Sequence, residues 1–257
     1  MRNRFRGLLL AVVAALAFSS VVFAQTASQS GAATTRTVGP SPGIAGVWVP
    51  AREFVRSFNA DEVPPMQPWA EKEFNALREG LSDPNARRDD MDPATNCAPL
   101  GFPRILMIPL PTEIIQLSGK VLMLFEWDHW IRPIYTDGRD HPKDDDLDPT
   151  WMGHATGRWD GDTLVVDTVG LKGNGVTWID TVGHPHTEAL HIVERWRRID
   201  YDTLQVDFTF DDPKAYTKPW KGQYVFTLKP DWEIVEYVNC EDHLREVHLQ
   251  KFIKEPR

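Results

Sequence analysis

Short runs of apolar and β-branched residues alternate with turn residues from Arg104 onward. The expected strands cover residues 105–110, 113–117, 121–127, 130–135, 157–159, 163–169, 190–199, 203–210, 223–228 and 234–238. Asp160-Gly161 between two such runs is a strong hairpin signal. Strands do not alternate with helices, so a parallel sheet is not expected. The pattern predicts a mainly β protein, with an antiparallel meander of nine or ten strands closing into a barrel or sandwich.

One amphipathic helix is expected before the strands. Pro68 is suited to a first helical position, and Trp69, Phe74, Leu77 and Leu81 recur at helical spacing. The predicted helix spans about three turns and ends near Gly80.

The period of two within the strands predicts which side chains are buried. Leu204, Val206, Phe208 and Phe210 share one face of their strand. Glu194 shares a face with Leu190, Ile192 and Trp196, and Glu126 with Leu122 and Leu124. A carboxylate on an apolar face needs a partner or a raised pKa. Arg132 and Arg198 are candidate partners, so each glutamate is either half of a buried ion pair or an acid or base in a cavity.

The start of the chain has the pattern of a secretory signal peptide. Arg2, Arg4 and Arg6 precede an apolar stretch from Leu8 to Val22, and Val22-Phe23-Ala24 offers a cleavage site. The expected organisation is a signal peptide over residues 1–24, a flexible leader over 25–42 and a single β-rich domain over 43–257. The protein is therefore expected to be exported, to the periplasm or beyond. In that oxidising compartment Cys97 and Cys240 are expected to form a structural disulfide.

Charge, hydrophobic length and missing motifs limit the classes of partner that the protein is expected to bind. The formal net charge is −9 over 257 residues, which argues against nucleic acid as a partner. No other stretch approaches membrane length, so stable membrane insertion is not expected. The sequence lacks a Gly-x-Ser-x-Gly nucleophile motif, a phosphate loop and a dinucleotide fingerprint. A small-molecule ligand remains the expected partner, and the oligomeric state is not encoded.

Histidines crowd into one part of the chain. His129, His141, His154, His184, His186 and His191 fall within about sixty residues. Two Gly- and Pro-containing loops, residues 135–142 and 183–188, hold three of these histidines and several of the acidic residues around them, and such stiff loops favour fixed side chains. Three interpretations stay open. His184, His186 and His191 could bind Zn²⁺ or another divalent metal, although no cofactor is required. One histidine could be a general base oriented by a carboxylate. The histidines could also be surface residues of the loops.

The most distinctive segment runs from Trp151 to Thr168, with the pattern Gly-His-x-x-Gly-Arg-Trp-x-Gly-Asp-Thr-Leu-Val-Val-Asp-Thr. It resembles a family of secreted bacterial proteins, and the resemblance extends through Asp137-Gly138-Arg139, His184-Pro185-His186 and Glu194-Arg195. It implies a shared fold and no particular activity. Gly46-Val47-Trp48 resembles the Gly-x-Trp opening of lipocalin-like barrels, which implies a lipocalin-like barrel.

These features together favour an acid–base enzyme without a covalent nucleophile: a lyase, isomerase or hydrolase acting on a small apolar or aromatic molecule. The expected catalytic residues are His154 with His141, His186 or Glu194 as partner, and Arg139 for a developing negative charge. The expected substrate-binding residues are Glu126, Trp130, Arg132, Trp151 and Trp196. The alternatives are a lipocalin-like carrier without catalysis and a histidine-ligated metalloprotein.

Overall fold

The computed structural model of the chain describes residues 43–51, 56–59, 62–83 and 92–237. The expected signal peptide, the leader and Cys240 lie outside the described residues, so those predictions and the Cys97–Cys240 disulfide stay predictions.

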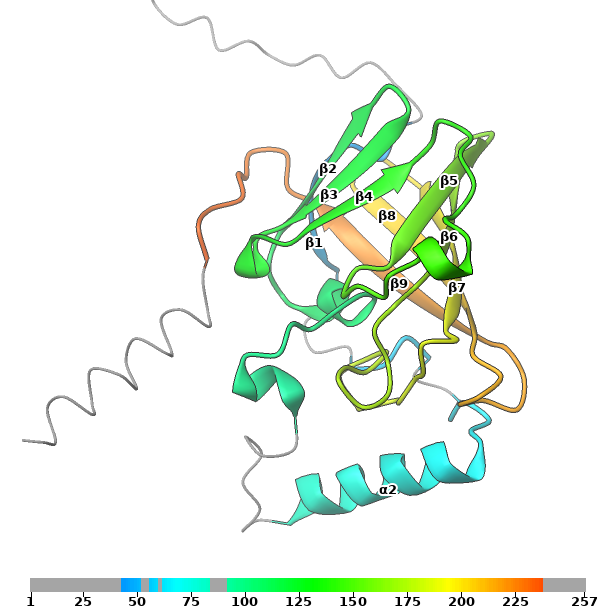
Figure 1. The fold of residues 1–257 in the computed structure, drawn as a ribbon. Coiled ribbons are helices and arrows are strands. Elements are labelled where there is room, and N and C mark those ends of the chain that lie inside the picture. Colours follow the sequence, from blue (N-terminus) through cyan, green and yellow to red (C-terminus); the bar gives the residue numbers. More distant parts are fainter. Residues whose placement is uncertain (1–42, 52–55, 60–61, 84–91, 238–257) are drawn as a thin grey trace, which may run out of the picture. The chain divides into compact units, whose positions relative to one another are not determined.

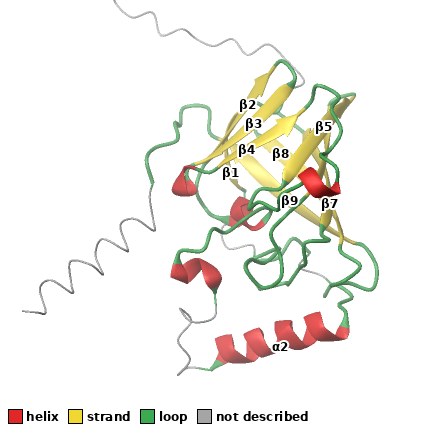
Figure 2. Ribbon diagram, in the orientation of Figure 1, coloured by secondary structure: helices red, strands yellow, loops and turns green. Residues whose placement is uncertain are grey.

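Nine strands of the described chain form one closed barrel in sequence order, as expected for a lipocalin-like protein (Figures 1 and 2). They are β1 (Gly46–Pro50), β2 (Thr112–Leu117), β3 (Lys120–Phe125), β4 (Ile131–Tyr135), β5 (His154–Asp160), β6 (Thr163–Val169), β7 (His191–Arg198), β8 (Thr203–Asp211) and β9 (Trp220–Leu228). β1 pairs with both β2 and β9, which closes the barrel.

The expected meander is wrong at one position. β5 pairs in parallel with β4, through Ile134 opposite Ala155 and Tyr135 opposite Thr156, while the other neighbouring strands pair antiparallel. A parallel pair needs a crossover rather than a tight turn. The long connection over residues 136–153 provides it, and it passes over the outside of the barrel next to β5 and β6.

Two other runs expected as strands are not strands. Arg104–Met107 is a short 3-10 helix, and its residues are buried. An unbroken buried apolar run has no period by which helix and strand can be distinguished. Residues 234–237 form no strand in the described chain.

The helix is where the sequence predicted it. α2 (Pro68–Ser82) begins with Pro68 and ends two residues beyond Gly80. Ala70 and Phe74 are buried, and the Phe74 ring stacks on His184 at a centroid distance of 4.6 Å. Trp69, expected on the buried face, is 42% exposed and donates from its indole nitrogen to the carbonyl of Lys214. No described helix is long and apolar enough to cross a membrane.

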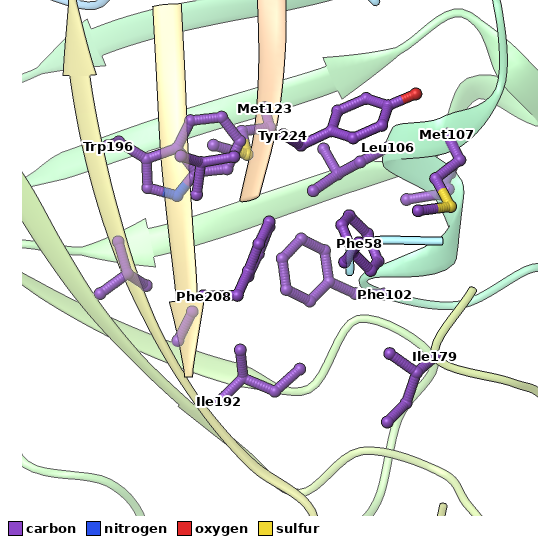
Figure 3. Close-up of a cluster of buried hydrophobic side chains, with 14 of the residues drawn as sticks. Phe58, Phe102, Leu106, Met107, Met123, Ile179, Ile192, Trp196, Phe208 and Tyr224 are labelled. Atoms are coloured by element: carbon purple, nitrogen blue, oxygen red, sulfur yellow. The ribbon is translucent and has the colours of Figure 1, made fainter. Parts of the chain in front are cut away.

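Large side chains fill the barrel interior. Phe102, Leu106, Met123, Trp196 and Phe208 belong to one buried cluster (Figure 3). The four expected inward residues of β8 are all buried. Because the protein's own core occupies this interior, a functional site can equally lie among the polar groups on the outer face or at the ends of the barrel.

Candidate acid–base site

Adjacent strands place a carboxylate and two imidazoles on the outer face of the barrel. Asp167 on β6 lies opposite Val193 on β7 and Thr156 on β5. His154 and His191 are each two residues from those positions, so they share that face. Their strand neighbours Ala155 and Ile192 are buried on the other face.

The crossover connection adds the third imidazole. His141 Nδ1 lies 2.8 Å from Nδ1 of His154, and His141 Nε2 lies 3.0 Å from Oδ1 of Asp167. Oδ2 of Asp167 is 2.9 Å from Nε2 of His191. Asp167 therefore holds two imidazoles at once, one through each oxygen.

Local packing fixes this arrangement. Gly153, directly before His154, has a φ of +67°, and a Cβ there would lie 2.8 Å from the carbonyl oxygen of Val169. Only glycine fits such a close approach in the left-handed region. The crossover is held by Leu147, which packs against Gly170, where an added Cβ would meet it at 2.9 Å. Close packing thus fixes the backbone directly before His154 and the crossover that carries His141.

Hydrogen bonding determines which nitrogens carry protons. The carboxylate of Asp167 only accepts, so His141 donates from Nε2 and presents a lone pair at Nδ1. That lone pair accepts from the Nδ1–H of His154. In the neutral ring this leaves the lone pair of His154 on Nε2, which has no hydrogen-bond partner among the described residues. The chain of contacts therefore presents one imidazole nitrogen as a proton acceptor.

The surroundings of His154 and His191 shift their pKa values in opposite directions. Partial burial, together with the nearby charges of His141 and Arg139, lowers the pKa of His154. The hydrogen bond to Asp167 raises the pKa of His191, against the opposing effect of burial. The pKa of Asp167 is lowered, chiefly by the hydrogen bond from His191. At neutral pH His154 is therefore uncharged, and His141 links it to an ionised carboxylate, as suits a general base.

Cations and an aromatic ring border His154. The Tyr135 ring stacks on His154 at 5.4 Å between centroids. The Arg139 guanidinium lies 4.0 Å from the Tyr135 centroid, and the Lys120 ammonium lies 5.3 Å from it. Arg139 also pairs with Asp137, whose Oδ1 is 2.9 Å from Nε of Arg139, and this bond lowers the pKa of Asp137. Two cations, Arg139 and Lys120, and two carboxylates, Asp137 and Asp167, therefore belong to this cluster.

Glu194 is not a partner of His154. It lies in the barrel interior, fully buried, with Oε2 3.1 Å from Nη1 of Arg132 and 2.8 Å from Nε1 of Trp196. Thr168 donates to its other oxygen, at 2.8 Å. The guanidinium carbon of Arg132 also lies 3.6 Å from the centroid of the Phe102 ring.

Of the two interpretations of Glu194, the buried ion pair with Arg132 is the one that the structure contains. Arg198, the other candidate partner, instead donates to the carbonyl of Tyr201.

His186 is not brought to His154 either. It is fully buried in the segment before β7, and its Nδ1 lies 3.1 Å from the carbonyl oxygen of Thr187. Burial lowers the pKa of His186. His184 beside it pairs through Nδ1 with Oδ2 of Asp180, at 2.6 Å. His191 is bonded to Asp167 instead, so the three histidines of the alternative metal site are not brought together. Among the described residues no group of three or more His, Cys, Asp or Glu side chains is arranged to hold a metal ion.

The expected substrate-binding residues fall in several places. Arg132 and Trp196 belong to the interior network with Glu194. Glu126 lies just after β3 and accepts from the backbone N–H of Val235. Trp130 is half-buried against the core, and Trp151 lies under the ammonium of Lys172, 4.9 Å from the ring centroid. None of the five is hydrogen-bonded to His154 or stacked on it in the described part of the chain.

Sequence reasoning missed Asp167, the residue that links the cluster. The available signal was the one applied to Glu126 and Glu194: a single carboxylate within the apolar run Thr163–Val169. In this strand, however, the carboxylate lies on the outer face with Val165 and Val169. Comparison of the chain with protein-family models and with curated proteins gives no match.

Proposed function

We propose that the outer-face cluster is a general acid–base site, with His154 Nε2 as the atom that takes and returns a proton. The observation that carries the proposal is the chain Asp167–His141–His154, with contacts of 3.0 and 2.8 Å. Such a chain fixes the tautomer and orientation of the terminal imidazole. A carboxylate plays the same part in other catalytic sites where it orients a histidine base.

The proton balance is simple. Neutral His154 removes a proton from a C–H or O–H group of the substrate, which leaves an anion and an imidazolium. The imidazolium donates through Nδ1 to His141, and the negative charge of Asp167 stabilises the pair. Return of the proton to another atom of the same molecule is an isomerisation, and return to a leaving group is an elimination. No covalent intermediate is needed.

Two neighbouring features suit a small aromatic or apolar substrate. The Tyr135 ring packs against His154 and adds apolar character to its surroundings. Arg139 and Lys120 lie over the same ring and would stabilise the negative charge that develops when the proton leaves. The substrate class is therefore a small molecule that carries an acidic C–H or O–H group next to a planar apolar part.

A carrier without catalysis is the second candidate, because the closed barrel is a fold that can hold ligands. The two candidates make different demands on His154. A carrier would bind a ligand and release it unchanged, whereas the acid–base site would exchange a proton of the ligand with water.

Proton exchange in D₂O tests the proposal directly. A panel of enolisable carbonyl compounds is incubated with the protein, and loss of the C–H signal is followed by ¹H NMR. We expect His154→Gln to slow exchange by about 10²–10⁴-fold, the usual contribution of a general base. His129→Gln, which changes a histidine away from the cluster, serves as the matched control and leaves the rate unchanged. Exchange at the wild-type rate in His154→Gln contradicts the proposal, and binding without exchange across the panel favours the carrier.

A further inference from the structure

Asp167 binds two imidazoles, and the proposed acid–base reaction uses only one of them. Oδ1 accepts from His141, which leads to His154, while Oδ2 accepts from Nε2 of His191 at 2.9 Å. His191 lies on β7 and is partly exposed, so water reaches it. The second imidazole therefore contacts the same carboxylate as the chain that leads to the base, through the other oxygen.

Protonation of His191 changes the charge of this contact and not its geometry. Because a carboxylate only accepts, Nε2 of His191 already carries a hydrogen in the neutral ring. Nδ1 is therefore the atom that takes up a proton from water. When it does so, the Asp167–His191 pair changes from a net negative charge to none, while the hydrogen bond between Nε2 and Oδ2 remains.

The groups around His191 favour its protonated form. The hydrogen bond to Asp167 raises the pKa of His191, burial opposes this effect, and the charges of Asp167 and Asp211 raise the pKa further. Asp211 lies opposite His191 on β8. The charged or titratable groups around His154, at the other end of the chain of contacts, are His141, Arg139, Tyr135 and Lys120.

The charge of Asp167 matters to His154 because proton abstraction makes the His154 ring positive. With His191 neutral, the negative charge of the carboxylate stabilises that imidazolium through His141. With His191 protonated, its positive charge offsets the carboxylate. His154 on β5 and His191 on β7 flank strand β6, so their backbones are about 10 Å apart. A unit charge at that distance changes a rate by roughly 2- to 15-fold, for effective dielectric constants between those of bulk water and of a protein surface.

We propose that His191 is a positioning residue that sets the strength of the base: loss of its proton restores the charge of Asp167 and speeds proton abstraction by His154. The inference rests on the proposed function at His154 and adds a regulator of that same site. Because Nε2 of His191 stays bonded to Asp167 in both states, the tautomers of His141 and His154 are kept and only the charge changes. The site is therefore faster on the alkaline side of the His191 titration than on its acid side.

The pH profile of proton exchange in D₂O tests this role, with the same panel of carbonyl compounds. The pKa of His154 is lowered and that of His191 is raised. The wild-type rate should therefore rise first as His154 loses its proton and again, by about 2- to 15-fold, as His191 loses its proton at higher pH. His191→Gln keeps an N–H at the position of Nε2 but is never charged. We expect it to lack the second rise and to be faster than the wild type at neutral pH. A second rise that persists in His191→Gln, or a lower rate than the wild type at neutral pH, overturns the proposal.

Two further variants separate charge from local structure. Asp211→Asn removes the negative charge opposite His191, so the second rise is expected to move to lower pH and to keep its size. Arg195→Gln is the matched control. It removes a positive charge from the same strand, at an exposed side chain that pairs with Asp160, and is expected to leave both rises unchanged. An unmoved second rise in Asp211→Asn, or its loss in Arg195→Gln, contradicts the assignment. If His191→Gln does not fold, the wild-type profile and Asp211→Asn decide.

An NMR titration distinguishes failure of this inference from failure of the proposed function. The ring signals of His154 report its proton affinity without a substrate, and His191→Gln is expected to raise that affinity by about 2- to 15-fold. An unchanged affinity in a protein that exchanges substrate protons overturns the role of His191 alone. A raised affinity in a protein that exchanges no substrate proton overturns the proposed function, and with it the effect of His191 on a rate.

Discussion

The inner and outer faces of β6 and β7 carry two polar networks that differ in how fully they are matched. Inside, Glu194 receives hydrogen bonds from Arg132, Thr168 and Trp196, and all four side chains are buried. Outside, Asp167 binds His141 and His191, and the chain ends at a half-buried His154 with a nitrogen still available.

This difference distinguishes polar groups that stabilise the fold from polar groups that can react with a substrate. The carboxylate of Glu194 has its hydrogen-bonding capacity used by neighbours within the core, so it has little left for a substrate. The outer cluster ends at an atom that solvent or a ligand can reach. Burial alone is therefore a poor guide to function in this barrel. Nε of Arg132 also lacks a hydrogen-bond partner among the described residues, but it is buried. An unused hydrogen-bonding atom that solvent can reach is the better guide.

The largest expected effect comes from breaking the inner pair. Glu194→Gln leaves the guanidinium of Arg132 buried without its counter-charge, and loss of one partner of a buried pair costs about 3–5 kcal/mol of unfolding free energy. His154→Gln, on the outer face, is expected to change it by about 0.5 kcal/mol or less. Urea denaturation followed by tryptophan fluorescence measures both. Equal destabilisation by the two variants would remove the distinction between the networks.

Asp167→Asn sharpens the comparison on the outer face. The carboxamide can donate to His141 Nε2, which moves the hydrogen of His141 to Nδ1 and that of His154 to Nε2. His154 then has no lone pair for the substrate, and we expect exchange to slow on the order of 100-fold, or about 2.7 kcal/mol in the activation barrier. Proton exchange in D₂O gives the rate, and nitrogen-15 NMR gives the tautomers. Asp160→Asn, on the exposed end of β5, is the control. An unchanged rate in Asp167→Asn would show that the carboxylate does not set the tautomer.

The smallest expected effect is a pH dependence of stability. The pKa of His191 is raised in the folded protein by its bond to Asp167. Its contribution is therefore fully present below the unfolded value of about 6.5 and is lost as the pH rises through the raised folded pKa. The pKa of His154 is lowered, so its effect has the opposite sign and falls below pH 6.5.

His191→Gln isolates this contribution. Because the His191–Asp167 pair is partly exposed, the pair is expected to contribute less than about 1 kcal/mol. Urea midpoints are compared on the alkaline side of pH 6.5, where wild-type stability is expected to fall and that of His191→Gln to fall less. A wild-type protein whose stability rises with pH in that range would contradict the raised pKa.

Elements with a clear period were predicted well. The inward face of β8, the hairpin at Asp160-Gly161 between β5 and β6, and the start of α2 at Pro68 were all read from spacing and turn chemistry. The 3-10 helix at Arg104–Met107 was not predicted, because the apolar run that begins at Ile105 has no polar positions by which a helix and a strand could be distinguished. The parallel β4–β5 pair was missed because its crossover contains no long helix to signal it.

The sequence by itself determined the mainly β class and the residues from which a site could be built, because the strand period and the identities of the side chains are local properties. The strand period left a barrel and a sandwich open, and the closure of β1 onto β9 decided between them. The tertiary structure alone decided which of them meet. Glu194 and Asp167 are both carboxylates in apolar strands, yet one points into the core and the other outward. His141 and His186 are both loop histidines, yet only His141 reaches His154. Sequence separation carries no information about such contacts, because they depend on how the strands close and where the crossover runs.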